Sequence, residues 1–112
     1  MITELGRIDV AKFAVHDGRI AFEFHISGKG WGVVKTFECG WDTSEEELKK
    51  PLSRYKWTHE SRLQKIGMNG WEVVELMKKA KVSSLDKMVG IPVRCTFLEG
   101  AITHMAILEE VL

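Results

Sequence analysis

The chain has 112 residues, which is the length of one domain and leaves no room for a second hydrophobic core. Its hydrophobic fraction of 45% and charged fraction of 29% are ordinary for a globular protein and argue against a disordered chain. Sixteen Lys and Arg residues balance sixteen Asp and Glu residues. A net charge of zero argues against a uniformly basic phosphate-binding surface, so any charged site must be local.

The sequence carries no signal for membrane insertion, export or metal binding. No apolar run reaches the roughly 20 residues that span a bilayer, and the N-terminus lacks a signal-peptide pattern, so we expect a cytoplasmic protein that does not contact a membrane. Cys39 and Cys95 are the only cysteines and form no Cys-x-x-Cys motif, so neither a metal nor another cofactor is predicted. Each lies in an apolar stretch, which favours a buried thiol over a disulfide.

The first forty residues predict an antiparallel meander of three strands. Apolar residues recur from Ile8 to Val15, and Asp17-Gly18 tolerates the positive φ angles of a tight hairpin turn. From Ile20 to Ile26, large apolar residues alternate with small or polar ones, which is the period of a strand buried on one face. A glycine-rich turn then leads into a third strand, from Trp31 to Cys39.

The charge pattern changes sharply after Trp41. Thr43 and Ser44 are candidate N-caps of a short helix, each with a Glu three residues later, and Pro51 limits that helix to about two turns. Residues 42–47 are acidic, whereas residues 49–65 hold six Lys or Arg residues and only one acid. We therefore interpret residues 42–65 as a charged insertion.

One main helix is predicted in the second half of the chain. Between Ser61 and Ala80, apolar residues recur at spacings of three, four and seven, as in an amphipathic helix. Gly67 and Gly70 weaken the first part, since each glycine costs about 1 kcal/mol relative to alanine in a helix interior. We therefore expect a break or a helix start near Gly70, with the helix best defined over Trp71 to Ala80.

A closing hairpin follows. Ile91 to Phe97 alternate as a strand, and Glu99-Gly100 turns the chain into a final strand from Ala101 to about Glu109. Pro92 lacks an amide donor, which predicts that its strand starts at a sheet edge. A free edge along either strand would allow a homodimer. The predicted fold is a single α+β domain, residues 1–112, in which an antiparallel sheet of about five strands packs against one main helix.

Two stretches combine cations with aromatic side chains. Arg54-Tyr55-Lys56-Trp57 lies in the basic stretch, and this combination is typical of nucleic-acid or nucleotide binding and of protein hot spots. Alternatively, the two aromatic rings pack under a surface loop while the cations stay in water. The turn with Lys29 and Trp31 lacks the P-loop spacing, and it is either an anion cradle or a flexible hairpin turn.

No pattern marks an enzyme. The four histidines are scattered through the chain, and a general acid or base needs a second group within hydrogen-bond reach. The serines lie in predicted turns or caps, without a Gly-x-Ser-x-Gly elbow. We therefore expect a binding protein without catalytic residues.

A more specific pattern fills the last third of the chain: Lys81 to Cys95 (KVSSLDKMVGIPVRC), the acidic Glu99-Gly100 turn, and Ile102 to Leu108. These segments resemble the C-terminal half of a group of small phage and prophage proteins of unknown function. Gly28 to Gly32 and Trp41-Asp42 extend the similarity weakly, and residues 43–65 have no counterpart.

This resemblance has two departures, because Leu85 stands where the group usually has Trp, and Lys81 stands where it has Gly. It implies a phage-derived accessory protein and transfers no catalytic residue. Small phage proteins of this kind often bind a host factor, including components of host immunity.

The leading hypothesis is therefore a protein that binds a host protein, such as an anti-CRISPR-like inhibitor of a defence system. The alternative is a nucleic-acid or cyclic-nucleotide binding protein, with phosphate contacts from Lys29, Arg54 and Lys56 and base stacking on Trp31 or Trp57. The candidate partner-binding residues are Lys29, Trp31, Trp41, Arg54, Tyr55, Lys56 and Trp57.

Overall fold

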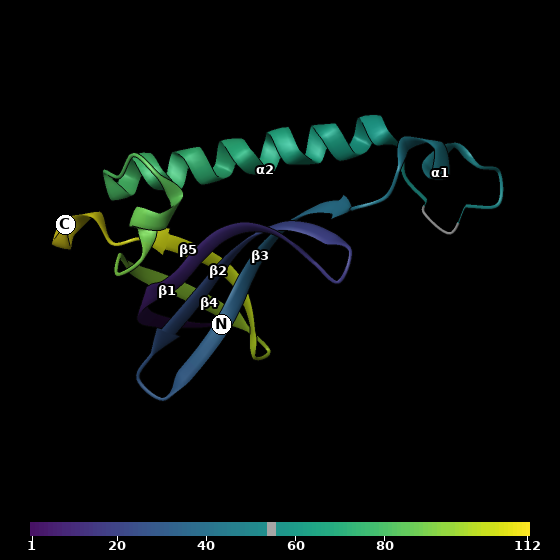
Figure 1. Cartoon of the computed structure of the whole chain (residues 1–112). Helices are drawn as coiled ribbons and strands as arrows, with labels where there is room; N and C mark the ends of the chain where they lie inside the picture. The colour runs from purple at the N-terminus through teal and green to yellow at the C-terminus, as the bar shows by residue number, and fades with distance from the viewer. Residues whose placement is uncertain (54–55) are drawn as a thin grey trace.

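A computed structural model of the chain describes residues 1–53 and 56–112. Within these residues, five antiparallel strands form one sheet in the order β3-β2-β1-β4-β5, and one long helix, α2, lies across a face of it (Figure 1). The predicted α+β fold is confirmed. The elements are β1 (Ile2–His16), β2 (Arg19–Gly28), β3 (Trp31–Trp41), α1 (Glu45–Lys49), α2 (His59–Ala80), β4 (Pro92–Leu98) and β5 (Ala101–Ile107), with short 3-10 helices at Leu85–Met88 and Glu109–Val111.

Strand β1 joins the two halves of the sheet. It pairs with β2 from Gly6 to His16 and with β4 from Ile2 to Arg7, so it starts well before the predicted Ile8. Its turn into β2 is the expected one, because Asp17 and Gly18 have φ angles of 52° and 79°. The long strand therefore carries the meander at one end and the closing hairpin at the other.

A β-bulge interrupts β1 directly after Ile8. Ile8 pairs with Ile26, and the next regular pair is Val10 with His25. Beyond the bulge, each side chain therefore points to the face opposite to the one that the alternation before it would give. Ile8 is fully buried on the helix-covered face, while Val10 lies on the other face and is 38% exposed. For this reason, the apolar residues of β1 do not follow a single period of two.

The hydrophobic core lies between α2 and the sheet. Phe24 and Ile26 are buried on the helix side of β2, as their alternation predicts. The core is completed from the second half of the chain by Val73, Ala80, Met88, Val93, Cys95, Met105 and Ile107. Cys39 and Cys95 are buried free thiols, as predicted.

Helix α2 is continuous from His59 to Ala80, so the predicted break near Gly70 is wrong. A capping box starts the helix: the backbone amides of Thr58 and Ser61 each donate to the hydroxyl oxygen of the other residue, both at 3.0 Å. A Cβ at Gly70 would lie 3.8 Å from the Phe22 ring, so the helix packs closely against the sheet there. Packing of one helix face on the sheet outweighs the low helix propensity of the two glycines.

Strand β4 is an inner strand, so the predicted edge position of Pro92 is wrong. β4 pairs with β1 on one side and with β5 on the other. Pro92 is the first residue of the strand, where the missing amide breaks no continuous ladder, and its carbonyl accepts from Leu108 N at 3.0 Å. A second copy therefore cannot pair along β4, and the free edges of the sheet belong to β3 and β5.

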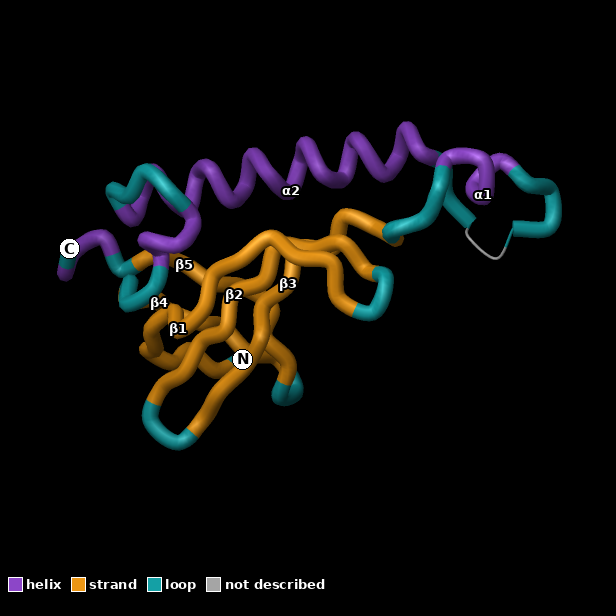
Figure 2. The backbone as a smooth tube through the Cα atoms, viewed as in Figure 1, coloured by secondary structure: helices purple, strands orange, loops and turns teal. Residues whose placement is uncertain are grey.

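Between β3 and α2 the chain makes an excursion beyond the end of the sheet, which carries α1 (Figure 2). Ser44, one of the two N-cap candidates, caps α1 by accepting from Glu47 N at 3.1 Å. The end of the predicted insertion, residues 59–65, belongs to α2. No helix in the described part of the chain is long and apolar enough to cross a membrane.

The two buried thiols make a prediction about pH. Burial raises the pKa of Cys39 and of Cys95, although a hydrogen bond from Asn69 partly opposes the rise at Cys39. Above about pH 8.5, where cysteine ordinarily ionises, the unfolded chain loses these protons and the folded chain keeps them. We therefore expect the free energy of unfolding, measured in urea, to fall from pH 7.5 to pH 9.5.

The matched control is the Cys39→Ala, Cys95→Ala double variant, whose stability should change less over the same pH interval. An equal change in the two proteins would contradict the prediction. Slow alkylation of both thiols by iodoacetamide in the folded protein, and rapid alkylation in urea, would report the same burial independently.

Candidate binding groove

An open groove of about 460 Å³ lies where the start of α2 meets the C-terminal end of β3. Three elements contribute to it: the start of β2, the end of β3, and the chain entering α2. Its lining residues are Arg19, Glu38, Cys39, Gly40, Trp41, Trp57, Ser61 and Lys65.

The groove depends on a bulge in β3. Ile20 pairs with Gly40 and Ala21 pairs with Glu38, which leaves Cys39 as the extra residue. Gly40 has a φ of +124°, and a Cβ there would overlap the ring of Trp57. The indole of Trp57 therefore lies directly on the backbone of β3, and only glycine leaves room for it.

Trp41 forms another part of the lining and is supported by the turn between β1 and β2. A Cβ at Gly18 would lie 3.6 Å from the Trp41 ring, and the Arg19 guanidinium carbon lies 5.1 Å from the ring centroid. Arg19 Nη1 also lies 3.0 Å from Glu38 Oε1. Both charged side chains are more than half exposed, so this ion pair contributes at most about 1 kcal/mol and can rearrange around a ligand.

Two polar side chains on the inner face of α2 fix the geometry of the groove. Arg62 is 8% exposed, and its Nη1 donates to the carbonyl oxygens of Trp41 at 2.9 Å and Thr43 at 2.6 Å, while its Nη2 contacts His59 Nδ1. Asn69, two turns further along, donates to the Glu38 carbonyl at 2.7 Å. These bonds hold the bulged end of β3 against the helix.

By charge alone, Arg62 is one cation of the basic stretch, and its buried role is not predicted. A usable signal was present, because Arg62, Asn69, Val73 and Ala80 follow one another at spacings of seven, four and seven. These spacings place all four on one face of a helix. An arginine on the apolar face of a helix indicates a buried partner, here the backbone of β3.

The structure brings together only some of the predicted partner-binding residues. Trp41 and Trp57 share the groove, and Lys56 is exposed beside Trp57. Lys29 and Trp31 lie at the opposite end of β3, so the three tryptophans do not meet on one face. Arg54 and Tyr55 lie outside the described residues.

The position of the Trp31 ring explains two of the glycines around it. A Cβ on Gly6 or on Gly28 would collide with its indole, which therefore lies across the backbones of β1 and β2. The ring meets Phe97 edge to face with 5.3 Å between centroids. The glycine before the β2–β3 turn thus makes space for a packed tryptophan.

The basic stretch, residues 49–65, presents less positive charge at the surface than its sequence suggests. Lys49 pairs with Glu45 at 3.1 Å, and Lys50 pairs with Glu47 at 2.9 Å. These contacts lower the pKa of Glu45 and raise the pKa of Lys50. The acidic and basic segments therefore neutralise each other across α1, and Arg62 is used internally.

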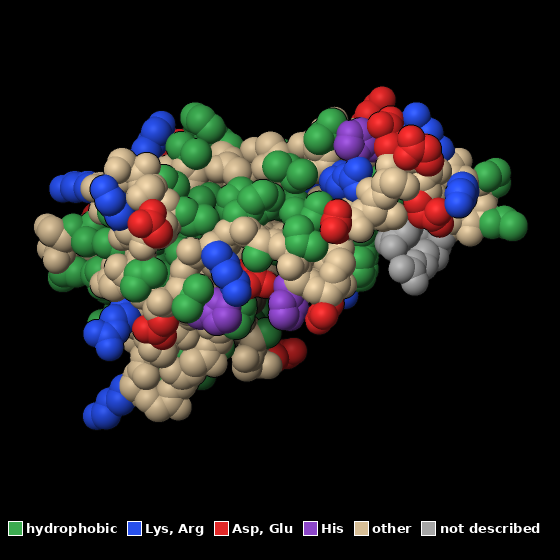
Figure 3. Space-filling model, viewed as in Figure 1, with side chains coloured by type: hydrophobic (Ala, Val, Ile, Leu, Met, Phe, Trp, Pro, Cys, Tyr) green, Lys and Arg blue, Asp and Glu red, His purple; other side chains and the backbone are tan. Residues whose placement is uncertain are grey.

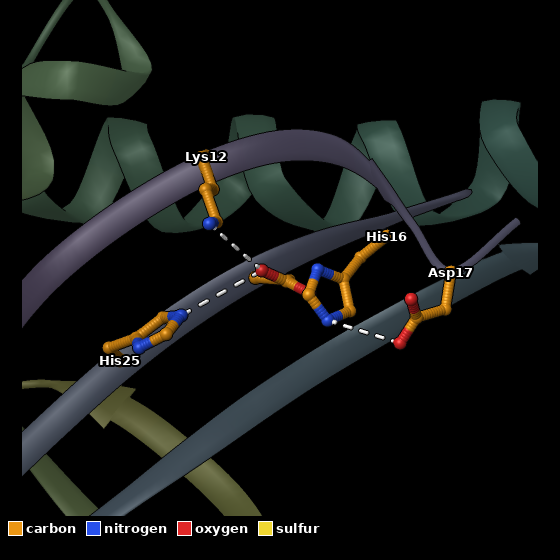
Figure 4. A network of polar contacts seen from close by, with 5 residues as sticks. Lys12, His16, Asp17 and His25 are labelled. Carbon is orange, nitrogen blue, oxygen red and sulfur yellow. Dashed lines mark ion pairs between the residues drawn. The ribbon is translucent and has the colours of Figure 1, made fainter. Parts of the chain in front are cut away.

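A separate polar network lies on the sheet face opposite α2 (Figure 4). Lys12 Nζ and His25 Nε2 lie 3.6 and 3.7 Å from the same oxygen of Glu23, and His16 Nε2 lies 3.5 Å from Asp17. These are cross-strand, same-strand and turn contacts of an open sheet face, and none of these residues lines the groove. Among the described residues, no group of three His, Cys, Asp or Glu side chains could hold a metal ion.

Comparison of the chain with protein-family models, curated proteins and solved structures found no match in any of the three. The groove and the surfaces around it are therefore the observations from which a function is inferred.

Replacing Gly40 by Ala tests the contact beneath Trp57. We expect a loss of stability in urea from two sources, the positive φ angle and the overlap of the new Cβ with the indole. Gly30→Ala is the matched control, because Gly30 also has a positive φ, +80°, but nothing lies within 4 Å of its Cβ position. The control should lose about 1–2 kcal/mol, and Gly40→Ala about 1–3 kcal/mol more. Equal losses would contradict the contact.

Replacing Arg62 by Met tests the link between α2 and β3. The carbonyls of Trp41 and Thr43 would lose their charged donor, which should lower the free energy of unfolding by about 2–4 kcal/mol. Lys65→Met removes an exposed charge from the same helix and should change it by no more than about 0.5 kcal/mol. Similar stabilities of the two variants in urea would show that the link is weak.

Proposed function

We propose that the chain is a non-enzymatic accessory protein of phage or prophage origin that binds a host protein through the groove between Trp41 and Trp57. The observation that carries this proposal is the meeting of two tryptophans, with Arg19 and Lys65, in a groove at the surface. Tryptophan and arginine are the residues that most often dominate the energy of protein interfaces.

The rigidity of the groove supports this role. Trp57 lies against the backbone at Gly40, and Arg62 and Asn69 bind the carbonyls at the end of β3. A preformed site loses little conformational entropy when a partner binds. A side chain of the partner would therefore enter the groove with limited rearrangement.

The charges around the groove indicate the chemistry of the partner surface. Arg19 and Lys65 line it, Lys56 is exposed beside Trp57, and Glu38 is the acidic residue of the lining. This excess of positive charge favours an acidic partner surface with an apolar anchor residue. The proposal that this partner belongs to a host defence system rests on the resemblance to small phage proteins.

Binding of a nucleotide or nucleic acid is the second candidate. In its favour, the groove combines indole rings with Lys65, as a stacked base next to a phosphate would require. Against it, Lys49 and Lys50 are ion-paired and Arg62 is buried, which leaves fewer phosphate contacts than the sequence suggests. We therefore favour the protein partner.

The test is capture from bacterial lysate with tagged wild-type protein and with Trp57→Ala, followed by affinity measurement on the purified partner. We expect Trp57→Ala to weaken binding about 30-fold, the effect of a hot-spot residue worth 2 kcal/mol. Leu98→Ala is the control, because it removes a 53% exposed apolar side chain that lies outside both the groove and α2. Equal affinities of the three proteins for the partner would overturn the proposal.

Titration of tryptophan fluorescence with cyclic nucleotides and single-stranded oligonucleotides separates the two candidates. A response that requires Lys65 and weakens steeply with salt would replace the protein-binding proposal by the nucleotide one. A flat response together with loss of the captured protein in Trp57→Ala would support the protein partner.

A further inference from the structure

Helix α2 has a second apolar face that points away from the sheet. Its inner face is buried through Arg62, Val73 and Ala80. Yet Leu63, Met68, Trp71 and Val74 are exposed by 54%, 65%, 60% and 37%. Figure 3 shows hydrophobic side chains at the surface along this helix. A surface helix normally keeps polar residues on its outer side, so this exposed face indicates an interaction site.

The outward residues follow the period of a helix–helix seam. Six exposed residues succeed one another at spacings of four, three, four, three and four, which places them in one row along the outer side of the helix, with the apolar Trp71 and Val74 towards its C-terminal half. They are Glu60, Gln64, Gly67, Trp71, Val74 and Lys78. We call these six residues the outer seam of α2.

We propose that a second copy of the chain packs antiparallel on the outer seam and forms a symmetric dimer. If the two-fold axis passes near residue 69, each seam residue of one copy meets a different seam residue of the other. Glu60 then faces Lys78 of the second copy, Gln64 faces its Val74, and Gly67 faces its Trp71. Each contact occurs twice, as a two-fold interface requires.

Charge decides the direction of this packing. Glu60 lies in the first turn of α2, and Lys78 lies in the last turn. A parallel pair of helices would place Glu60 against Glu60 and Lys78 against Lys78, whereas the antiparallel pair places opposite charges together at both ends. The Lys78 ammonium already lies 3.6 Å from Glu75 Oε1 of the same helix and 5.0 Å from the centre of the Trp71 ring, so Glu60 of the second copy would add a second carboxylate to this cation.

Gly67 supplies a second, independent argument. It lies inside an exposed helix, where glycine costs about 1 kcal/mol relative to alanine. Nothing lies within 4 Å of its Cβ position, so the fold of a single copy does not explain a glycine there. In the antiparallel dimer the large indole of Trp71 from the second copy needs this space, and small residues allow helices to approach closely.

The dimer leaves both binding grooves open. Ser61 and Lys65 line the groove from another side of α2, and the outer seam contains no groove residue. The dimer proposal therefore does not depend on the proposed function. A dimer with two grooves would bind a multivalent partner more tightly than one copy does.

The test is sedimentation equilibrium over a range of concentrations with charge-swapped variants. We expect a wild-type dimer, and Glu60→Lys should weaken it about tenfold because both ion pairs become repulsive. The double variant Glu60→Lys, Lys78→Glu should recover most of the loss, because opposite charges face each other again. Lys79→Glu, an exposed residue outside the seam, is the matched control and should leave the dimer unchanged.

Filling the space at Gly67 gives a second test that does not involve charge. Gly67→Leu should disrupt the dimer and preserve the circular dichroism of the helix, since leucine is the better helix former. A wild-type protein that stays monomeric, or a dimer that none of the seam variants weakens, would overturn the proposal. Because the seam and the groove are separate, per-site affinity for a partner should be the same in the dimer and in the Gly67→Leu monomer.

Discussion

The junction between α2 and the sheet, and with it the groove, depends on the buried guanidinium of Arg62. The bulge at Cys39 and the positive φ of Gly40 turn the end of β3 out of regular pairing. A buried carbonyl without a donor costs about 1–3 kcal/mol. From α2, Arg62 donates to the carbonyls of Trp41 and Thr43, and the Trp41 carbonyl also accepts from Thr43 N at 3.0 Å. Together with Asn69, this side chain holds α2 against the end of β3 that carries Trp41 and on which Trp57 packs.

Much of the fold could be predicted, because its main elements follow simple periods. The alternation of β2 and the Asp17-Gly18 turn are local signals, and both hold in the structure. The continuity of α2 was missed because propensity counts the cost of Gly70 but not the packing of that helix face on Phe22. The inner position of β4 was missed because a proline at the start of a strand is as acceptable inside a sheet as at its edge.

The candidate site was less predictable, because it depends on contacts between distant residues. The sequence predicts both Trp41 and Trp57 as partner-binding residues, yet nothing local indicates that Gly40 leaves room for an indole on the backbone. Trp31 looked equivalent to them in the sequence, and only the strand register shows that it lies across Gly6 and Gly28. The positive charge of the basic stretch is also partly neutralised in the structure, since lysines of α1 and its C-cap pair with glutamates of the same helix.

The excursion between Thr43 and Thr58 is held at both ends by contacts with α2. Arg62 binds the Thr43 carbonyl, and Thr58 caps the helix that carries Arg62. The length of the chain between two such fixed ends matters little, because doubling a flexible loop costs only about 0.6 kcal/mol. A longer segment between these two ends would therefore leave the contacts of Arg62 and the cap at Thr58 in place. The sheet and α2 form a frame whose integrity does not depend on the length of the arm that it carries.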